Sequence, residues 1–170
     1  MIGLALALAL GAPTSIACPP GTEHRGARPT DGYEEWCEAP GPDGNARREG
    51  PARTYYDDGG VWIESSYHEG RLEGPFLERY RSGMRAREGA YQGGQRTGAW
   101  RFFYEDGTLQ EEASFVRGVP DGRFADYWPN GKPRNTGRRC LGAQCGPWSS
   151  YDEAGRLVGT VEYGEQRPEP

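Results

Sequence analysis

The chain has 170 residues, enough for one domain, and only 35% of them are hydrophobic, which is a low fraction for a globular core. Its net charge of −5 at pH 7 disfavours nucleic acid or an anionic membrane surface as the main partner. Composition alone is compatible with disorder, but the regular spacing of many of the 27 glycines argues against it.

The first segment, residues 1–17, has the features of a secretory signal peptide. Residues 2–10 are apolar, and Ser15 and Ala17 are small residues at the two positions that determine cleavage before Cys18. The apolar run is about half the ~20 residues that a membrane-spanning helix needs. It departs from the usual pattern because no Lys or Arg precedes it. We expect an exported protein that is periplasmic, on the cell surface or extracellular.

Cleavage would leave Cys18 as the first residue, where a lipid anchor and a disulfide are alternatives. A lipoprotein signal normally has Leu three places before this cysteine, and this chain has Ser15 there. Lipidation of Cys18 would also leave Cys37 as a free thiol in an oxidising compartment, whereas four cysteines pair evenly. Proximity favours Cys18 with Cys37 and Cys140 with Cys145. Membrane attachment is expected only if Cys18 is lipidated.

Residues 18–49 are predicted to form an N-terminal cap. This segment is too poor in apolar residues to fold alone. A Cys18–Cys37 disulfide would contribute on the order of 3 kcal/mol through loop-closure entropy. We therefore expect this bond to hold the cap together.

Glycine recurs with a period of 24 residues through the rest of the chain. Two series keep this step: Gly50, Gly74, Gly98, Gly122, Gly146, and Gly59, Gly83, Gly107, Gly131, Gly155. Such a period indicates a stack of identical units, each burying its apolar face against its neighbours. The predicted repeats span 50–73, 74–97, 98–121, 122–145 and 146–167, and a flexible tail is expected at 168–170.

Positions counted from the first glycine of each repeat alternate as in a β-hairpin. The third position holds Ala52, Phe76, Trp100, Phe124 and Trp148, and the seventh holds Tyr56, Tyr80, Tyr104, Trp128 and Asp152. Their shared parity predicts that both positions face one side of a strand. The tenth-position glycine follows Asp or Asn in three copies, which predicts a type I′ turn. Positions 12 to 18 alternate again as the return strand.

Two further columns complete the repeat. The sixteenth position is mostly small and leaves room for neighbouring rings: Ser65, Gly89, Ala113, Gly137 and Val161. A third glycine opens a short loop to the next copy, at Gly70, Gly94, Gly118 and Gly142. No stretch after the signal peptide has helical periodicity. The predicted fold is all-β, an elongated single-layer antiparallel meander of about ten strands built from five 24-residue β-hairpin repeats.

The fourth repeat departs most from the pattern. Pro133 occupies a strand position, and Arg139 replaces the closing aromatic residue. Cys140 and Cys145 flank the loop into the fifth repeat, where a disulfide would offset the lost packing. A redox switch or metal site is disfavoured there because the spacing is C-x4-C and no His lies nearby.

Blocks such as GAWRFFYEDGTLQEEASFVRGVPDG and GPFLERYRSGMRAREGAYQGGQRTG resemble the bacterial variant of the MORN repeat, found in proteins labelled YwqK-family antitoxins. The shared motif is G-x-W/F-x-x-x-Y, then x-G, a closing aromatic residue and x-G, and it covers residues 50 to about 167. The resemblance implies a fold of stacked β-hairpins and a role in binding or scaffolding. It implies no conserved catalytic residues.

The sequence contains none of the common catalytic motifs, including G-x4-G-K-[ST], H-E-x-x-H, C-x-x-C and G-x-S-x-G. His24 and His68 lie in different modules and lack a third metal ligand nearby. Acidic pairs occur at Asp57–Asp58, Glu111–Glu112 and Asp152–Glu153. Adjacent strand residues point to opposite faces, and the turn acids have a sufficient role in turn geometry. We expect no enzyme activity, no metal and no cofactor.

A basic cluster straddles the second hairpin turn, at Arg79, Arg81, Arg85 and Arg87. Glu78 and Glu88 flank it, so we interpret it as a solvated edge and not as a nucleic-acid site.

The candidate binding face is the aromatic stripe, which comprises Tyr56, Tyr80, Trp100, Tyr104, Trp128 and Trp148. In a single-layer sheet such a stripe is first of all the core, although part of it can stay open and stack on sugars or grip a peptide. The hypothesis is a non-catalytic exported repeat protein that acts as a protein-interaction or envelope-associated scaffold. The alternatives are a cell-wall glycan-binding module and a toxin-neutralising, antitoxin-like inhibitor.

Export predicts that protein recovered from its native compartment begins at Cys18 and has no reactive thiol. N-terminal sequencing and a thiol count on the unfolded protein measure both quantities. An intact Met1, or four reactive thiols, would contradict the signal peptide and the disulfides together.

Overall fold

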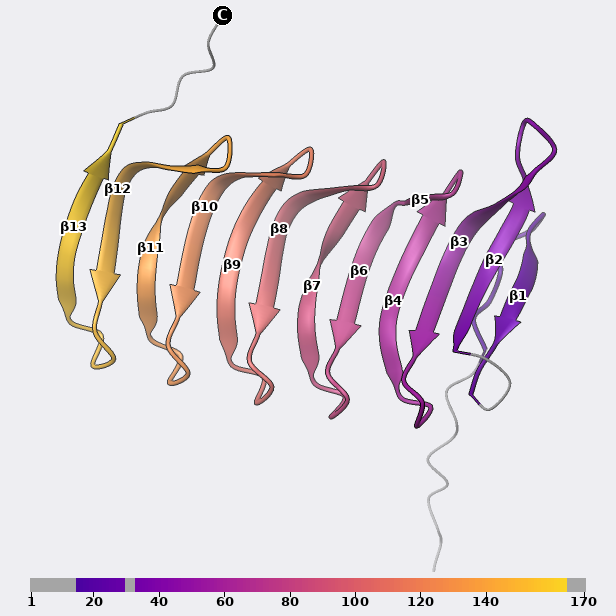
Figure 1. The fold of residues 1–170 in the computed structure, drawn as a ribbon, viewed down its shortest axis with the longest axis horizontal. Coiled ribbons are helices and arrows are strands. Elements are labelled where there is room, and N and C mark those ends of the chain that lie inside the picture. Colours follow the sequence, from indigo (N-terminus) through magenta and orange to yellow (C-terminus); the bar gives the residue numbers. More distant parts are fainter. Residues whose placement is uncertain (1–14, 30–32, 165–170) are drawn as a thin grey trace, which may run out of the picture.

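The computed structural model describes residues 15–29 and 33–164. Most of the predicted signal peptide, residues 1–14, and the predicted tail, 168–170, lie outside the described residues. The described part forms one open antiparallel sheet of thirteen strands (Figure 1). None of its elements is a helix that could span a membrane. The strands are β1 Glu23–Ala27, β2 Glu34–Pro40, β3 Ala46–Tyr55, β4 Val61–His68, β5 Arg71–Leu72, β6 Gly74–Arg79, β7 Arg85–Gln92, β8 Gln95–Phe103, β9 Leu109–Val116, β10 Val119–Tyr127, β11 Pro133–Cys140, β12 Ala143–Tyr151 and β13 Leu157–Tyr163.

The strands lie side by side in chain order, and β1 and β13 form the two edges of the sheet (Figure 1). The short β5 pairs only with β4. The all-β meander predicted from the glycine period is confirmed, and the five repeats supply ten long strands, β3, β4 and β6 to β13. The cap was not predicted to form strands, yet it adds β1 and β2. It does so because β3 offers a free edge on which β2 pairs, with Trp36 opposite Ala52.

The turn at each hairpin tip is a type I turn followed by one left-handed glycine, so the predicted type I′ turn is wrong at this position. In the third repeat, the Gly107 N–H donates to the Tyr104 carbonyl (2.9 Å) and the Tyr104 N–H to the Thr108 carbonyl (2.8 Å). Gly107 has a φ of 88°, but Asp106 has no positive φ, which a type I′ turn requires. Asp106 instead accepts a hydrogen bond from the Thr108 N–H (2.8 Å), which explains the acid before the glycine.

Type I′ turns lie at the opposite rim of the sheet, between repeats. Both central residues have positive φ in the pairs Glu69–Gly70, Gly93–Gly94, Arg117–Gly118 and Leu141–Gly142. The flanking residues pair directly, as Val116 does with Val119. The Gly118 N–H also donates to the Arg96 carbonyl of the preceding repeat (2.9 Å), and equivalent bonds recur at Gly94 and Gly142. The Gly70 N–H donates in the same way to the Arg48 carbonyl of the cap. These turns therefore join successive repeats by hydrogen bonds as well as by the chain.

The core consists of third-position rings that cover the sixteenth-position residue of the preceding hairpin. A Cβ added to Gly89 would lie 2.4 Å from the Trp100 ring, and one added to Gly137 would lie 2.5 Å from Trp148. The repeats before the two tryptophans thus have glycine at the sixteenth position. The repeats before Phe76 and Phe124 have Ser65 and Ala113 there. Trp100 is 0% exposed, and its indole N–H donates to the Ala90 carbonyl (3.1 Å). Ring size and residue size are therefore matched from one repeat to the next.

The seventh-position residues lie one place beyond the strand ends, so they do not belong to the strand as predicted. Strands β3, β6, β8, β10 and β12 end at the sixth position, where the pairing register also shifts. The side chains instead donate hydrogen bonds to the next repeat: Tyr56 to the Arg79 carbonyl (2.7 Å), Tyr80 to Phe103 (2.6 Å), Tyr104 to Tyr127 (2.9 Å) and Trp128 to Tyr151 (3.1 Å). Asp152, the fifth member of the column, binds Arg156 of its own turn.

The fourth repeat replaces its missing ring with a cation. The Arg139 guanidinium lies 4.8 Å from the Phe124 ring centroid and 5.7 Å from that of Trp148. The Cys140–Cys145 disulfide spans the type I′ turn, with 5.8 Å between the two Cα atoms. Cys18 and Cys37 form the other disulfide, so both predicted pairings are confirmed.

A buried carboxylate ties the cap to the first repeat. Glu35 is 2% exposed and accepts hydrogen bonds from Tyr55 Oη (2.6 Å), Ser15 Oγ (2.7 Å) and Arg28 Nε (3.3 Å). Burial alone would raise the pKa of this carboxyl, but the Tyr55 and Ser15 hydroxyls and the Arg28 charge outweigh it and lower the pKa to about 2. Cleavage before Cys18 would remove Ser15 and leave the other two donors.

Replacing Gly89 with alanine should destabilise the protein by ~1–3 kcal/mol, because the new methyl group meets the Trp100 ring. The double variant Gly89→Ala/Trp100→Phe recreates the Ala113–Phe124 combination, so it should be less destabilised than the sum of its two single variants. Urea unfolding measures each free energy. The control is Gly164→Ala, where no atom lies within 4 Å of the added Cβ. Strict additivity, or an equal loss in the control, would contradict the packing rule.

Glu35→Gln should remove part of the pH dependence of stability. The folded-state pKa of Glu35 is lowered from an ordinary value of 4.5 to about 2. Its carboxylate therefore stabilises the folded state above about pH 4.5, and this contribution is lost as the pH falls toward 2. Urea unfolding at pH 7 and pH 3 should show a larger loss for the wild type than for Glu35→Gln, with Glu153→Gln in an exposed turn as the matched control. Identical losses in all three proteins would exclude this role for Glu35.

Candidate functional site

The structure divides the predicted aromatic stripe into two sets. Trp100 and Trp148 are buried at 0% and 6% exposure within the core. Tyr56, Tyr80, Tyr104 and Trp128 lie at the hairpin tips and donate to the next repeat. The six residues therefore do not form one open face, and their main contacts are structural.

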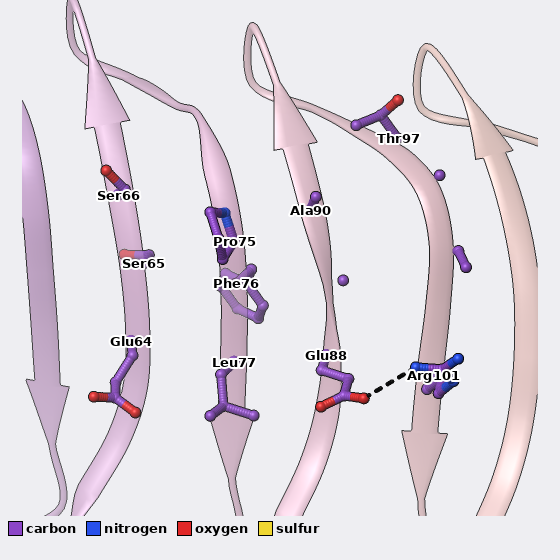
Figure 2. A pocket seen from close by; sticks show the side chains of 13 residues that line it. Glu64, Ser65, Ser66, Pro75, Phe76, Leu77, Glu88, Ala90, Thr97 and Arg101 are labelled. Atoms are coloured by element: carbon purple, nitrogen blue, oxygen red, sulfur yellow. Dashed lines mark hydrogen bonds and ion pairs between the residues drawn. The ribbon is translucent and has the colours of Figure 1, made fainter.

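The opposite face of the sheet carries an open groove of about 770 Å³ across β4, β6, β7 and β8 (Figure 2). Directly paired residues lie on the same face, so Pro75 with Ala90 and Ala99 with Ser114 belong to the face opposite Phe76 and Trp100. These short side chains form what we call the small-residue row: Ser66, Pro75, Ala90, Ala99 and Ser114. The groove exists because this row lies beside longer side chains.

The longer side chains form a border along the groove. Leu77 lies between Glu64 and Glu88 in this border, and a dashed line in Figure 2 joins Glu88 to Arg101 on the neighbouring strand. Glu64 pairs with Arg53 (2.9 Å) and Glu88 with Arg101 (3.5 Å). The border is thus largely neutralised by its own ion pairs, and the row beside it presents mainly uncharged surface.

The row ends at two arginines. Arg123 and Arg138 stand directly opposite each other on β10 and β11, at the same repeat positions as the small residues, and both are exposed. Within residues 15–29 and 33–164, neither forms an ion pair with an acid. Like charges directly opposite in a sheet destabilise it. This pair is therefore available to an anionic group, whose binding would offset the repulsion between the two arginines.

A second exposed feature lies at the tip of the first hairpin. Trp62 is 38% exposed, and its ring stacks on Tyr56 with centroids 5.7 Å apart. The Arg81 guanidinium lies 4.7 Å from the Tyr56 ring centroid and pairs with Asp57 and Asp58. Trp62 was not predicted as a site residue because it falls outside the repeated aromatic columns, and that isolation was the available signal.

The ionisable residues singled out in the sequence have structural partners. Asp58 accepts from the Gly60 N–H (2.9 Å), and Asp152 pairs with Arg156 (2.8 Å). Burial raises the pKa of Glu111, and Glu112 faces Arg101 across the strands. The described residues contain no group of three or more His, Cys, Asp or Glu side chains placed to hold a metal ion, and His68 binds Glu49 (2.9 Å).

The basic cluster of the second hairpin is likewise paired. Arg79 binds Glu64 (3.3 Å), Arg81 binds Asp57, Arg85 binds Glu88 (2.9 Å) and Arg87 binds Glu78 (2.5 Å). These arginines are held by neighbouring carboxylates, unlike Arg123 and Arg138.

The repeat unit has a recognised counterpart. Two segments of the chain, residues 48–69 and 96–117, match the MORN repeat variant. Each segment begins two residues before the first glycine of a repeat and ends in the type I′ turn, so it covers one hairpin, β3–β4 or β8–β9. The matches lie in the first and third repeats. No curated protein matches the chain. The MORN repeat variant supports a repeat protein with a binding role.

Proposed function

We propose that this protein is an exported, non-catalytic binding protein that holds an extended segment of a partner protein on the small-residue row. The observation that carries the proposal is the groove itself, which lies on the face that the core does not use. The two disulfides are compatible with an oxidising compartment outside the cytoplasm. A bacterial source and an antitoxin-like role are supported only by the resemblance to YwqK-family repeats.

The dimensions of the row suit an extended peptide. The row and the two arginines beyond it cross seven strands, from Ser66 on β4 to Arg138 on β11. With neighbouring strands ~4.8 Å apart, this distance is about 29 Å. An extended chain advances ~3.3 Å per residue, which corresponds to about nine residues. A peptide crossing the strands would rest its backbone on Pro75, Ala90 and Ala99.

Charge selects among such peptides. Arg123 and Arg138 lack acidic partners among the described side chains, so an acidic residue at one end of the peptide would remove their mutual repulsion. The row thus favours a segment of small residues that ends in Asp or Glu.

Fluorescence anisotropy with a labelled nine-residue peptide, six Ala followed by three Glu, tests this function. The wild type should bind it, and both Arg123→Glu/Arg138→Glu and Ala99→Trp should weaken binding by about tenfold or more. Arg71→Glu, an exposed arginine on β5, is the matched charge-reversal control and should bind as the wild type does. Equal binding of a peptide with Lys in place of Glu, or no response to either groove variant, would reject the proposal.

Glycan binding is the second candidate, because the exposed Trp62 ring backed by Tyr56 offers a flat apolar surface bordered by Arg81 and Asp57. Purified cell wall should then retain the protein, soluble oligosaccharide should release it, and Trp62→Ala should abolish retention. Arg123→Glu/Arg138→Glu should leave retention unchanged. Retention that soluble oligosaccharide does not reverse would exclude glycan binding. It would leave the result with the peptide unaffected.

A further inference from the structure

The C-terminal edge strand β13 is the most exposed strand of the sheet. All seven of its residues are exposed, including Leu157 at 59%, Val158 at 72% and Val161 at 55%. An edge strand also presents unpaired backbone N–H and C=O groups. β13 therefore combines free hydrogen-bonding capacity with apolar side chains on both faces.

The other edge of the sheet is different. β1 carries Glu23 and Arg25, which are exposed and charged, as expected for an edge that is protected against pairing. Glu162 is the only charged residue within β13. The two edges are thus unequal, and only the C-terminal one has the composition of a pairing surface.

The fifth repeat is not adapted to receive another hairpin of the same kind. A following hairpin would place its ring on the sixteenth position, where Gly89 and Gly137 leave space and Val161 has a branched side chain. The seventh position would donate to that hairpin, and Asp152 is instead bound to Arg156. These two residues exclude a continuation of the stack in the same register and leave the β13 edge to a different partner.

We propose that this partner is β13 of a second copy of the chain, paired antiparallel about a twofold axis at Thr160. In this register Gly159 faces Val161 of the second copy on each side of the axis. Both residues lie on the same face as Trp148, because Trp148 pairs with Val161 and Ser150 pairs with Gly159. Leu157 lies beyond a register shift and pairs with Tyr151, so it belongs to the opposite face. The pairs next to the axis are therefore apolar on the core side.

The remaining pairs are compatible with the same register. Thr160 faces itself, and Glu162 faces Val158 rather than a second acid. Gly159 leaves room for the Val161 side chain of the second copy, so the residue that blocks another repeat fits a copy of its own strand. Self-complementarity of this kind is what an isologous dimer interface requires.

Size-exclusion chromatography with light scattering on the full oxidised chain tests the dimer. The wild type should have twice the mass of one chain, and Val158→Glu should be a monomer, because the new carboxylate faces Glu162 of the second copy. Val158 is 72% exposed, so the substitution leaves the fold of one copy intact. Val116→Glu is the matched control, since Val116 is 54% exposed on the interior strand β9 and this variant should stay dimeric. A monomeric wild type, or a Val158→Glu dimer, would overturn the proposal.

A second substitution tests the register. Thr160→Cys should form a covalent dimer on mild oxidation, because directly opposite Cβ atoms lie ~4.5–5.5 Å apart. Thr136→Cys occupies the equivalent position of the fourth repeat, inside the sheet, and should form none. Failure of Thr160→Cys to cross-link would contradict the twofold axis at Thr160.

Discussion

The structure depends on one recurring contact, in which an aromatic ring of one hairpin lies over a small residue of the hairpin before it. A single-layer sheet has no second layer to cover its apolar face, so each ring must be buried by its neighbours in the stack. Trp100 reaches full burial in this way over Gly89. Because the contact links adjacent repeats, no repeat is complete alone, and the stability of the stack is a sum over these interfaces.

This constraint assigns a separate use to each face of the sheet. The rings of Phe76, Trp100, Phe124 and Trp148 occupy one face and are packed against each other. The opposite face is released from packing, and its short side chains at Pro75, Ala90 and Ala99 leave a groove. The face that is available for recognition is therefore the one opposite the core, and it is not the face that carries the buried aromatic rings.

The same constraint explains the irregular copies. Arg139 takes the place of a ring because a guanidinium can lie over Phe124 and Trp148. The first hairpin uses Ala52 at the third position because β2 already covers that strand, with Trp36 opposite. In the fifth hairpin, Asp152 and Val161 depart from their columns, and β13 is the last strand of the sheet in the part of the chain that the structure describes.

Predictions from the sequence were correct where a residue type has a single structural role. They were wrong where the local backbone geometry determines the turn type. The period, the hairpins and both disulfides were predicted correctly. The type I′ turn was assigned to the Asp-Gly tip, but it lies between repeats at pairs such as Arg117–Gly118, where no Asp or Asn marks it. Tyr104 was assigned to a strand, but β8 ends at Phe103, and alternation alone does not reveal that the strand stops there.

The sequence by itself determined the unit and its order: a 24-residue hairpin, repeated five times, with apolar and small residues in register. Only the tertiary structure decided which residues meet between repeats, and hence that Tyr56 is a hydrogen-bond donor to the next hairpin and that Trp100 is core. It also showed that Arg123 and Arg138 stand opposite each other at the end of an open row. The physical reason is that periodicity specifies strands and turns, whereas burial depends on contacts between strands that the period does not encode.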